Sequence, residues 1–236
     1  FSSLFHQSSK MKTNHLFLVL LLMLSAAFAN AQNSGNAKTA FGIYAGANFQ
    51  NLNGKDFNGA KLENDMILGV HAGVNAQIPI APEFYFQPGL QFSTKGAKNT
   101  EDAITSKYQF SYLELPLNLV YKGALGNGFV MIGFGPYVGY AIKGKVTLEG
   151  GGSGKVESDV EFKNVVTLTD PLITPYFKAL DLGGNVFAGY EMASGIFLQL
   201  NSQFGMVKIN PEDERFPGGE TAIKNTGFGV SLGYRF

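Results

Sequence analysis

Few residues in this 236-residue chain have side chains suited to acid–base, nucleophilic or metal chemistry. The chain has no cysteine, so disulfides, thiolate metal sites and cysteine nucleophiles are excluded. Of its three histidines, His6 and His15 lie in an N-terminal segment that we expect to be removed, which leaves His71. His71 could act as a general base or a ligand, but no second imidazole or thiolate accompanies it. We therefore expect a packed histidine, with no catalytic residue, no metal, no cofactor and no enzymatic activity.

Two further motifs resemble known ligand sites only in part. The acids Glu212, Asp213 and Glu214 could hold calcium, which prefers several oxygen ligands, but they lack EF-hand spacing. A solvated run of charges is the simpler interpretation. Residues 139–145 match most of a phosphate-binding loop, yet Val146 stands where the magnesium-binding hydroxyl is needed, and no helix is predicted to follow.

Five charged residues are more informative, because all fall on the polar face of the alternating segments described next. They are Glu114, Lys143, Asp181, Glu191 and Arg235. A buried charge without a partner is costly, so we expect these residues to form ion pairs. Counting from the segment ends predicts one pair of Glu191 with Arg235 and a second pair of Lys143 with Asp181, at opposite ends of the fold.

The elements that must position these charges are strands, since apolar and polar residues alternate with period two and no sustained helical period follows residue 31. Eight such runs occur, at residues 41–50, 68–78, 84–93, 112–121, 130–142, 180–192, 196–205 and 228–236. The polar faces hold mainly Gly, Asn, Gln and Tyr, which suits a narrow interior filled by side chains. The sequence therefore predicts an all-β fold.

The connections between the runs separate a membrane barrel from a soluble sandwich, which alternates in the same way. Links after the second, fourth and sixth runs are short, whereas those after the first, third, fifth and seventh are long and polar. This asymmetry and the even strand count predict an eight-stranded antiparallel up-and-down transmembrane β-barrel with short periplasmic turns and long extracellular loops. Residues 150–154 are expected to form a flexible tip that joins two arms, 145–149 and 155–162, which extend beyond the membrane. In the alternative, this hairpin is inserted into the barrel wall, which would then have ten strands.

Aromatic and proline residues refine this picture. The apolar faces carry aromatic residues toward both ends, as interfacial girdles require. Those near the turns are Phe41, Phe84, Tyr121, Phe129, Tyr190 and Phe236, and those near the loops are Phe49 and Phe92. Because proline lacks the N–H that a strand ladder needs, Pro88, Pro116 and Pro136 predict a belt of bulges on three consecutive strands.

The N-terminus has the features of an export signal. Residues 1–10 precede Met11 and are interpreted as a non-native or upstream extension. Residues 11–31 combine a basic start, an apolar run and the small-x-small motif Ala29-Asn30-Ala31, which predicts a signal peptide cleaved after Ala31. Residues 32–39 then form a short linker to a barrel at 40–236. The apolar run is shorter than the ~20 residues that a transmembrane helix needs.

Several motifs resemble the PorT-like outer-membrane β-barrel family of Gram-negative bacteria, a porin-family group. They are the stretches 86–96 (FQPGLQFSTKG), 112–117 (YLELPL), 133–137 (GFGPY) and 180–183 (LDLG). The ending LGYRF resembles the terminal aromatic signal, here Tyr234 and Phe236, by which the barrel assembly machinery recognises its clients. The resemblance implies a cell outer membrane location, outer-membrane lipid as surroundings and that machinery as a partner during biogenesis.

Composition and resemblance together favour a non-enzymatic barrel whose surface loops serve adhesion, envelope integrity or accessory contacts with a secretion system. With 18 basic and 18 acidic residues, the chain has no electrostatic footprint for nucleic acid. Three alternatives stay open: a narrow small-solute pore, an enzyme using His71 with loop acids, and a soluble lipocalin-like carrier with its apolar faces inward.

Overall fold

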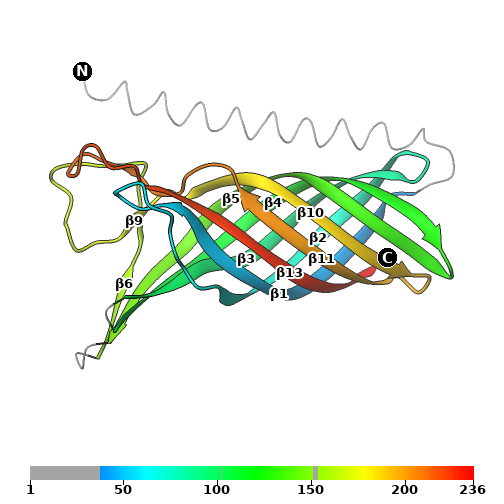
Figure 1. Ribbon diagram of the computed structural model, residues 1–236. Helices are drawn as coiled ribbons and strands as arrows, with labels where there is room; N and C mark the ends of the chain where they lie inside the picture. The colour runs from blue at the N-terminus through cyan, green and yellow to red at the C-terminus, as the bar shows by residue number, and fades with distance from the viewer. Residues whose placement is uncertain (1–37, 102, 151–153) are drawn as a thin grey trace, which may run out of the picture.

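The structure, a computed structural model, describes residues 38–101, 103–150 and 154–236. The predicted upstream extension and signal peptide, and most of the linker, lie outside these residues. Within them, no helix has the length and hydrophobicity needed to cross a membrane. Eight long strands dominate (Figure 1). They are β1 (Ala40–Lys55), β2 (Ile67–Ala81), β3 (Phe84–Glu101), β4 (Ile104–Leu125), β5 (Gly128–Gly150), β10 (Leu180–Met192), β11 (Ile196–Gly205) and β13 (Ala222–Arg235).

These eight strands form a closed antiparallel ring. Their order is β10, β11, β13, β1, β2, β3, β4 and β5, and β5 pairs back onto β10 from Tyr140 with Leu180 to Gly128 with Met192. Closure leaves no unpaired edge within the wall, which is the condition for strands to cross a hydrocarbon layer. The predicted eight-stranded up-and-down barrel is therefore confirmed.

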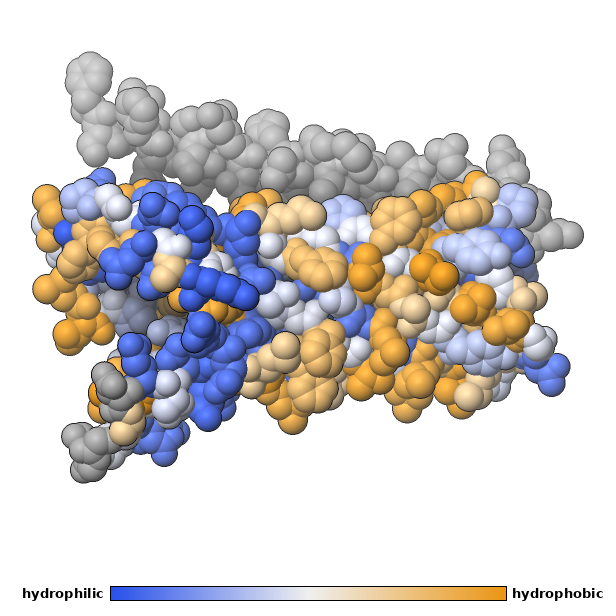
Figure 2. Space-filling model, viewed as in Figure 1, coloured by the Kyte–Doolittle hydropathy of each residue, from blue (hydrophilic) through white to orange (hydrophobic). Residues whose placement is uncertain are grey.

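The apolar face of each strand points outward. Val138 is 40% exposed and Leu232 is 62% exposed, whereas polar residues of the opposite face, such as Gln77 and Asn118, are buried. On the face shown in Figure 2, hydrophobic side chains accordingly cover most of the barrel wall, and most of the hydrophilic ones lie at the loop end. A soluble barrel would hide its apolar face inside, so this orientation excludes the lipocalin-like alternative.

The three turns at one end are short, as predicted. They join β2 to β3, β4 to β5 and β10 to β11. The β4–β5 turn has only Gly126 and Asn127 between the paired residues Leu125 and Gly128, and Gly126 has a φ of 59°. A left-handed residue in a two-residue turn matches the twist of the flanking strands, and glycine adopts it without steric cost.

The opposite end differs from the prediction at one link. The link after the third run is no loop, because β3 and β4 stay paired up to Glu101 with Ile104. The runs 84–93 and 112–121 thus underestimate both strands. The reason is that the outward side chains beyond the membrane become polar, which ends the apolar alternation while the ladder continues.

The predicted arms do pair with each other, but they add no wall strand. Residues 145–149 of β5 pair antiparallel with β6 (Lys155–Asp159), outside the ring. The ten-stranded alternative is therefore wrong. Four further short strands belong to the loops: β7 (Glu161–Phe162) pairs in parallel with β9 (Tyr176–Phe177), and β8 (Val165–Val166) pairs in parallel with β12 (Glu212–Asp213).

The predicted belt of proline bulges is also wrong. The β3–β4 ladder omits pairs beyond Pro88 but resumes in the same register. Pro88 pairs with Leu117, and the next pair, Gln91 with Glu114, lies three residues further along each strand, so neither strand has an extra residue between them. The register shifts of the wall strands lie elsewhere, between Pro79 and Ala81 against β3 and between Ser111 and Tyr112 against β5. The wall therefore tolerates a missing proline N–H by leaving out hydrogen bonds, without an inserted residue.

Candidate functional site: a filled lumen beneath interlocked loops

A buried charge cluster crosses the barrel interior. The ammonium group of Lys95 on β3 lies 2.6 Å from Glu114 Oε1 on β4 and 3.1 Å from Asp181 Oδ2 on β10. All three side chains are fully enclosed. Because β4 and β5 separate β3 from β10 in the wall, the contact with Asp181 spans the lumen. One cation between two carboxylates gives the cluster a formal charge of −1.

Neutral groups from other strands complete this cluster. Glu114 Oε2 accepts hydrogen bonds from the side-chain amides of Gln91, at 2.9 Å, and Gln203, at 3.1 Å. Asp181 Oδ2 accepts them from the Tyr137 hydroxyl, at 3.1 Å, and the Asn225 amide, at 2.9 Å. These hydrogen bonds satisfy Glu114 Oε2 and Asp181 Oδ2, whereas Asp181 Oδ1 is buried with no hydrogen-bond partner among the described residues. Six of the eight wall strands thus meet at one point inside the barrel.

A second cluster closes the turn end. Arg235 Nε donates to Glu191 Oε2 at 2.8 Å, so the structure brings together the Glu191 and Arg235 that the sequence paired. Lys122 on β4 lies 2.6 Å from Glu191 Oε1, and Arg235 Nη1 donates to Asn75 on β2 at 2.9 Å. Two cations with one carboxylate give +1, opposite in sign to the cluster around Lys95.

The predicted pair of Lys143 with Asp181 is wrong. Lys143 is exposed, and Asp181 binds Lys95 instead. The cause is a bulge: Ser111 pairs with Lys143 but Tyr112 pairs with Ala141, so Ile142 is an extra residue in β5. An extra residue reverses the faces beyond it, which turns Lys143 out of the lumen.

Lys95 and Lys122 are the functional residues that sequence reasoning missed. Each lies an even number of residues after an inward-facing residue of a predicted strand, and so faces inward too. Lys95 comes two residues after Ser93, and Lys122 comes four residues after Asn118. Extending the inward face past the last apolar outward residue would have found them. The period-two alternation therefore predicts that both lysines face inward, but the runs were ended at residues 93 and 121, before either lysine.

Clusters of buried apolar side chains lie on both sides of the Lys95 cluster. Toward the loops, Phe177 of β9 and Ile209 pack against Phe110, and the ring centroids of Phe110 and Phe177 are 4.8 Å apart. Toward the turns, the buried side chains of Val120, Met131, Phe187 and Phe197 form a second layer. Between them lies a cavity of about 30 Å³, lined by residues such as Tyr44 and Gln199. That volume is enough for a water molecule but for no solute.

His71 is a packed histidine within the lumen. It is buried, and its Nε2 lies 2.7 Å from the Ser231 hydroxyl. The acids considered as a calcium site, Glu212, Asp213 and Glu214, lie outside the lumen in the β11–β13 loop, where two of them pair with basic residues. Glu212 pairs with Lys208 at 2.6 Å, and Asp213 receives two hydrogen bonds from Arg215, which lower the pKa of its carboxyl below the usual value. In the described parts of the chain, no three Asp, Glu, His or Cys residues converge to hold a metal ion.

The loops above the lumen are bound to one another. The Glu212 amide donates to Asn164 at 3.0 Å and the Glu214 amide donates to Val166 at 2.9 Å, which joins the β11–β13 loop to the β5–β10 loop. Arg215 Nη1 adds a bond to the Pro171 carbonyl at 2.8 Å. These contacts hold the loop end in one defined shape above a closed interior.

Fold and interior together define a transmembrane β-barrel with a filled lumen and a structured loop end. The chain belongs to the outer membrane protein beta-barrel domain family, which it matches over residues 28–210. It is therefore an outer-membrane protein.

Solved structures with similar chains include Ail, the attachment invasion locus protein of Yersinia pestis, in complex with the heparin analogue sucrose octasulfate. That chain is 11% identical, with a TM-score of 0.40, and the match covers 85% of this chain and all of Ail. Neisserial surface protein A is 10% identical, with a TM-score of 0.43, covering 84% of this chain and 99% of the other. No curated protein matches the sequence.

Proposed function

We propose that the protein is a non-conducting, non-enzymatic outer-membrane barrel of a Gram-negative bacterium that acts through its extracellular loops. The observation that carries this proposal is the enclosed contact of Lys95 with Glu114 and Asp181 across the lumen. A solute path would have to break it and leave unpaired charges in an enclosed interior, which is strongly unfavourable. The apolar layers above and below support the same conclusion.

Conductance in a planar bilayer tests the closed lumen. Protein refolded in detergent and checked for heat-modifiable gel migration should insert without a steady current. Steady ion conductance by the correctly folded protein would favour the narrow porin alternative and contradict the proposal.

The loop end is proposed to contact a partner at the cell surface, in adhesion, envelope integrity or an accessory role in secretion. The arm formed by β5 and β6 gives a direct test, because Val146 and Ser158 are cross-strand partners at its base. Joining them through Asn-Gly removes the tip with a turn that suits a two-residue hairpin. The shortened barrel should fold normally but lose surface binding or resistance of the cell to large antibiotics.

The lipid-facing variant Leu200→Ala is the matched control, since it leaves the arm intact. Unchanged binding and unchanged antibiotic resistance in cells with the shortened arm would contradict a surface role of this arm. The two readouts also separate adhesion from envelope integrity.

The narrower assignments belong to the same proposal. Membership of the PorT-like group is supported by the stretches 86–96 and 133–137, and cleavage after Ala31 by the small-x-small motif. Recognition by the barrel assembly machinery is supported by the aromatic residues Tyr234 and Phe236 at the end of the last strand. N-terminal sequencing of the protein isolated from membranes should begin at Gln32.

A further inference from the structure

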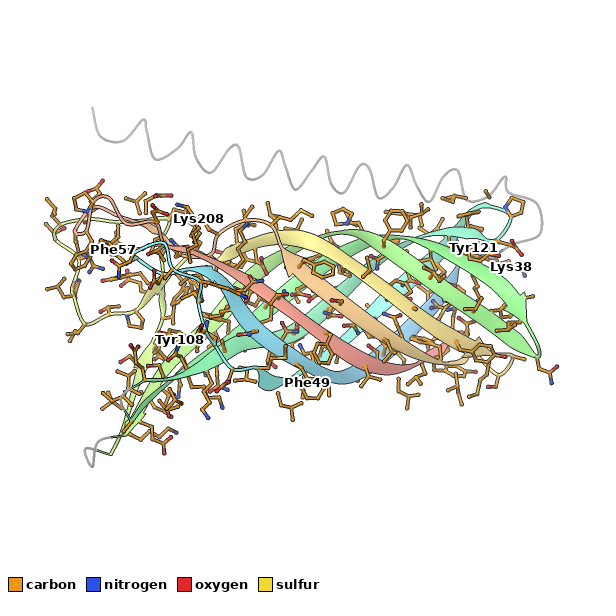
Figure 3. All side chains as sticks on the ribbon, viewed as in Figure 1. Lys38, Phe49, Phe57, Tyr108, Tyr121 and Lys208 are labelled. Carbon is orange, nitrogen blue, oxygen red and sulfur yellow. The ribbon has the colours of Figure 1, made fainter. Side chains whose placement is uncertain are left out.

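A cavity of about 440 Å³ opens among the loops at the extracellular end. Three loops build it: the β1–β2 loop supplies Phe57, the β5–β10 loop supplies Tyr176, and the β11–β13 loop supplies residues from Lys208 to Thr221. Phe57 and Lys208 both lie at this end of the barrel (Figure 3). The volume falls within the roughly 300–1,000 Å³ typical of small-molecule sites.

Hydrogen bonds between the loops hold the walls of this cavity in place. Besides the bonds that join the β11–β13 loop to the β5–β10 loop, the Glu220 amide donates to the Phe57 carbonyl at 3.0 Å. A Cβ on Gly219 would lie 2.5 Å from the Phe57 ring, so only glycine lets the chain cross this ring so closely. A preformed cavity loses little conformational entropy on binding, which favours affinity.

Aromatic rings give the cavity apolar surface that is open to solvent. Phe57 is 51% exposed and Phe216 is 53% exposed. Tyr176 is buried at the cavity wall, and its hydroxyl has no hydrogen-bond partner among the described residues. Exposed rings beside the exposed carboxylate of Glu214 suit a ligand with both C–H and hydroxyl surfaces.

The charges around the cavity argue against an anionic ligand. Arg215 holds Asp213 with two hydrogen bonds, at 2.9 and 2.7 Å, and Lys208 holds Glu212. Both cations that line the cavity are thus already neutralised. Glu214 is exposed and has no ion-pair partner within the described residues. An anion would meet this carboxylate with no free cation to bind it.

Cations of the protein already lie close to two of the aromatic rings of the cavity. The Arg215 guanidinium lies 5.2 Å from the Tyr176 ring and 5.8 Å from the Phe216 ring, and Lys163 lies 5.5 Å from Tyr176. Arg215 and Lys163 therefore already lie against the Tyr176 ring, and Arg215 lies near Phe216, so a second positive charge at either ring would be repelled. Phe216 is nevertheless 53% exposed, and that part of its ring stays open to a neutral group. What remains available is a free carboxylate that accepts hydrogen bonds and two half-exposed rings.

From this geometry we propose that the loop cavity binds a neutral carbohydrate. A sugar ring stacks its C–H face on Phe57 or Phe216 and donates a hydroxyl to Glu214, a charge-assisted hydrogen bond. The proposal rests on the surface-binding function above and specifies the class of ligand for it.

Ligand-observed NMR with the full chain, refolded in a detergent without a sugar headgroup, tests the proposal. Maltose, lactose and N,N′-diacetylchitobiose are the neutral probes, with a sulfated heparin disaccharide as the anionic probe and choline as the cationic probe. We expect at least one neutral sugar to bind more tightly than both charged probes. Glu214→Gln and Phe216→Ala should each weaken that binding by about tenfold or more. The control Glu149→Gln, on the exposed end of β5 outside the cavity, should leave it unchanged.

Glu214→Gln keeps the test valid if Phe216→Ala fails to fold, because an exposed carboxylate without an ion pair contributes little to stability. Three results would overturn the proposal: no binding of any neutral sugar, tighter binding of a charged probe, or equal weakening by Glu149→Gln. If sugar binding fails while the shortened arm still abolishes surface binding, the carbohydrate assignment is wrong and the surface function stands.

Discussion

Replacing Lys95 by methionine should destabilise the barrel more than almost any other single change in the lumen. The side chain is enclosed, and its removal leaves Glu114 and Asp181 facing one another without their shared cation. Removing one partner of a buried ion pair costs about 3–5 kcal/mol. Because two carboxylates lose their partner here, we expect a value toward the upper end of that range.

Two further variants make this prediction specific. Lys143→Met changes an exposed lysine and should alter the free energy of unfolding by no more than about 0.5 kcal/mol. Lys95→Met combined with Glu114→Gln and Asp181→Asn removes every charge of the cluster, and should recover most of the loss because no unpaired charge remains.

Urea unfolding in phospholipid vesicles, followed by far-UV circular dichroism, measures all three variants. A loss below about 1 kcal/mol for Lys95→Met would mean that water screens the cluster. The interior would then be hydrated, and the inference of a closed lumen would be refuted. A triple variant no more stable than Lys95→Met would show that the loss arises from packing and not from charge.

The other predictions concern the arm and the last strand. A hydrogen bond from Lys145 is the largest cause that lowers the pKa of Glu157 to about 2, from 4.5. Stability from this carboxylate is therefore complete above pH 4.5 and lost as the pH falls toward 2; an NMR titration midpoint near 4.5 would contradict this. Arg235→Ala should lower the unfolding free energy by about 1–3 kcal/mol through its bond to Glu191, and an unchanged urea midpoint would count against it. Deleting Phe236 should reduce the amount of barrel in the outer membrane, and normal levels on fractionation would refute its role as an assembly signal.

The sequence predicted the barrel better than it predicted the contacts inside it. Alternation and turn asymmetry gave eight strands and the correct outward face, because the hydrocarbon layer imposes both over the whole wall. The pair of Glu191 with Arg235 also followed, since both lie in regular strands close to the turns. The hydrocarbon layer requires an apolar outer face on every wall strand, so every strand shows the alternation of apolar and polar residues.

The contacts that the sequence did not predict lie where the alternation of apolar and polar residues stops. A single bulge at Ile142 turned Lys143 outward, and a bulge leaves no mark in one sequence. Lys95 lies beyond the lipid-facing part of β3, where outward residues no longer need to be apolar. The loop cavity depends on contacts among three segments far apart in the chain, such as Phe57 with Gly219. No local pattern encodes such contacts.

The direction in which alternate side chains face is tested most directly with two neighbouring residues of β11. The chain has no tryptophan, so a single introduced tryptophan reports on one position. Leu198 is exposed on the wall and Phe197 is buried in the lumen. In vesicles of brominated lipid, the fluorescence of Leu198→Trp should be strongly quenched and that of Phe197→Trp should be little affected. Stronger quenching at position 197 than at 198 would contradict the orientation of the entire barrel.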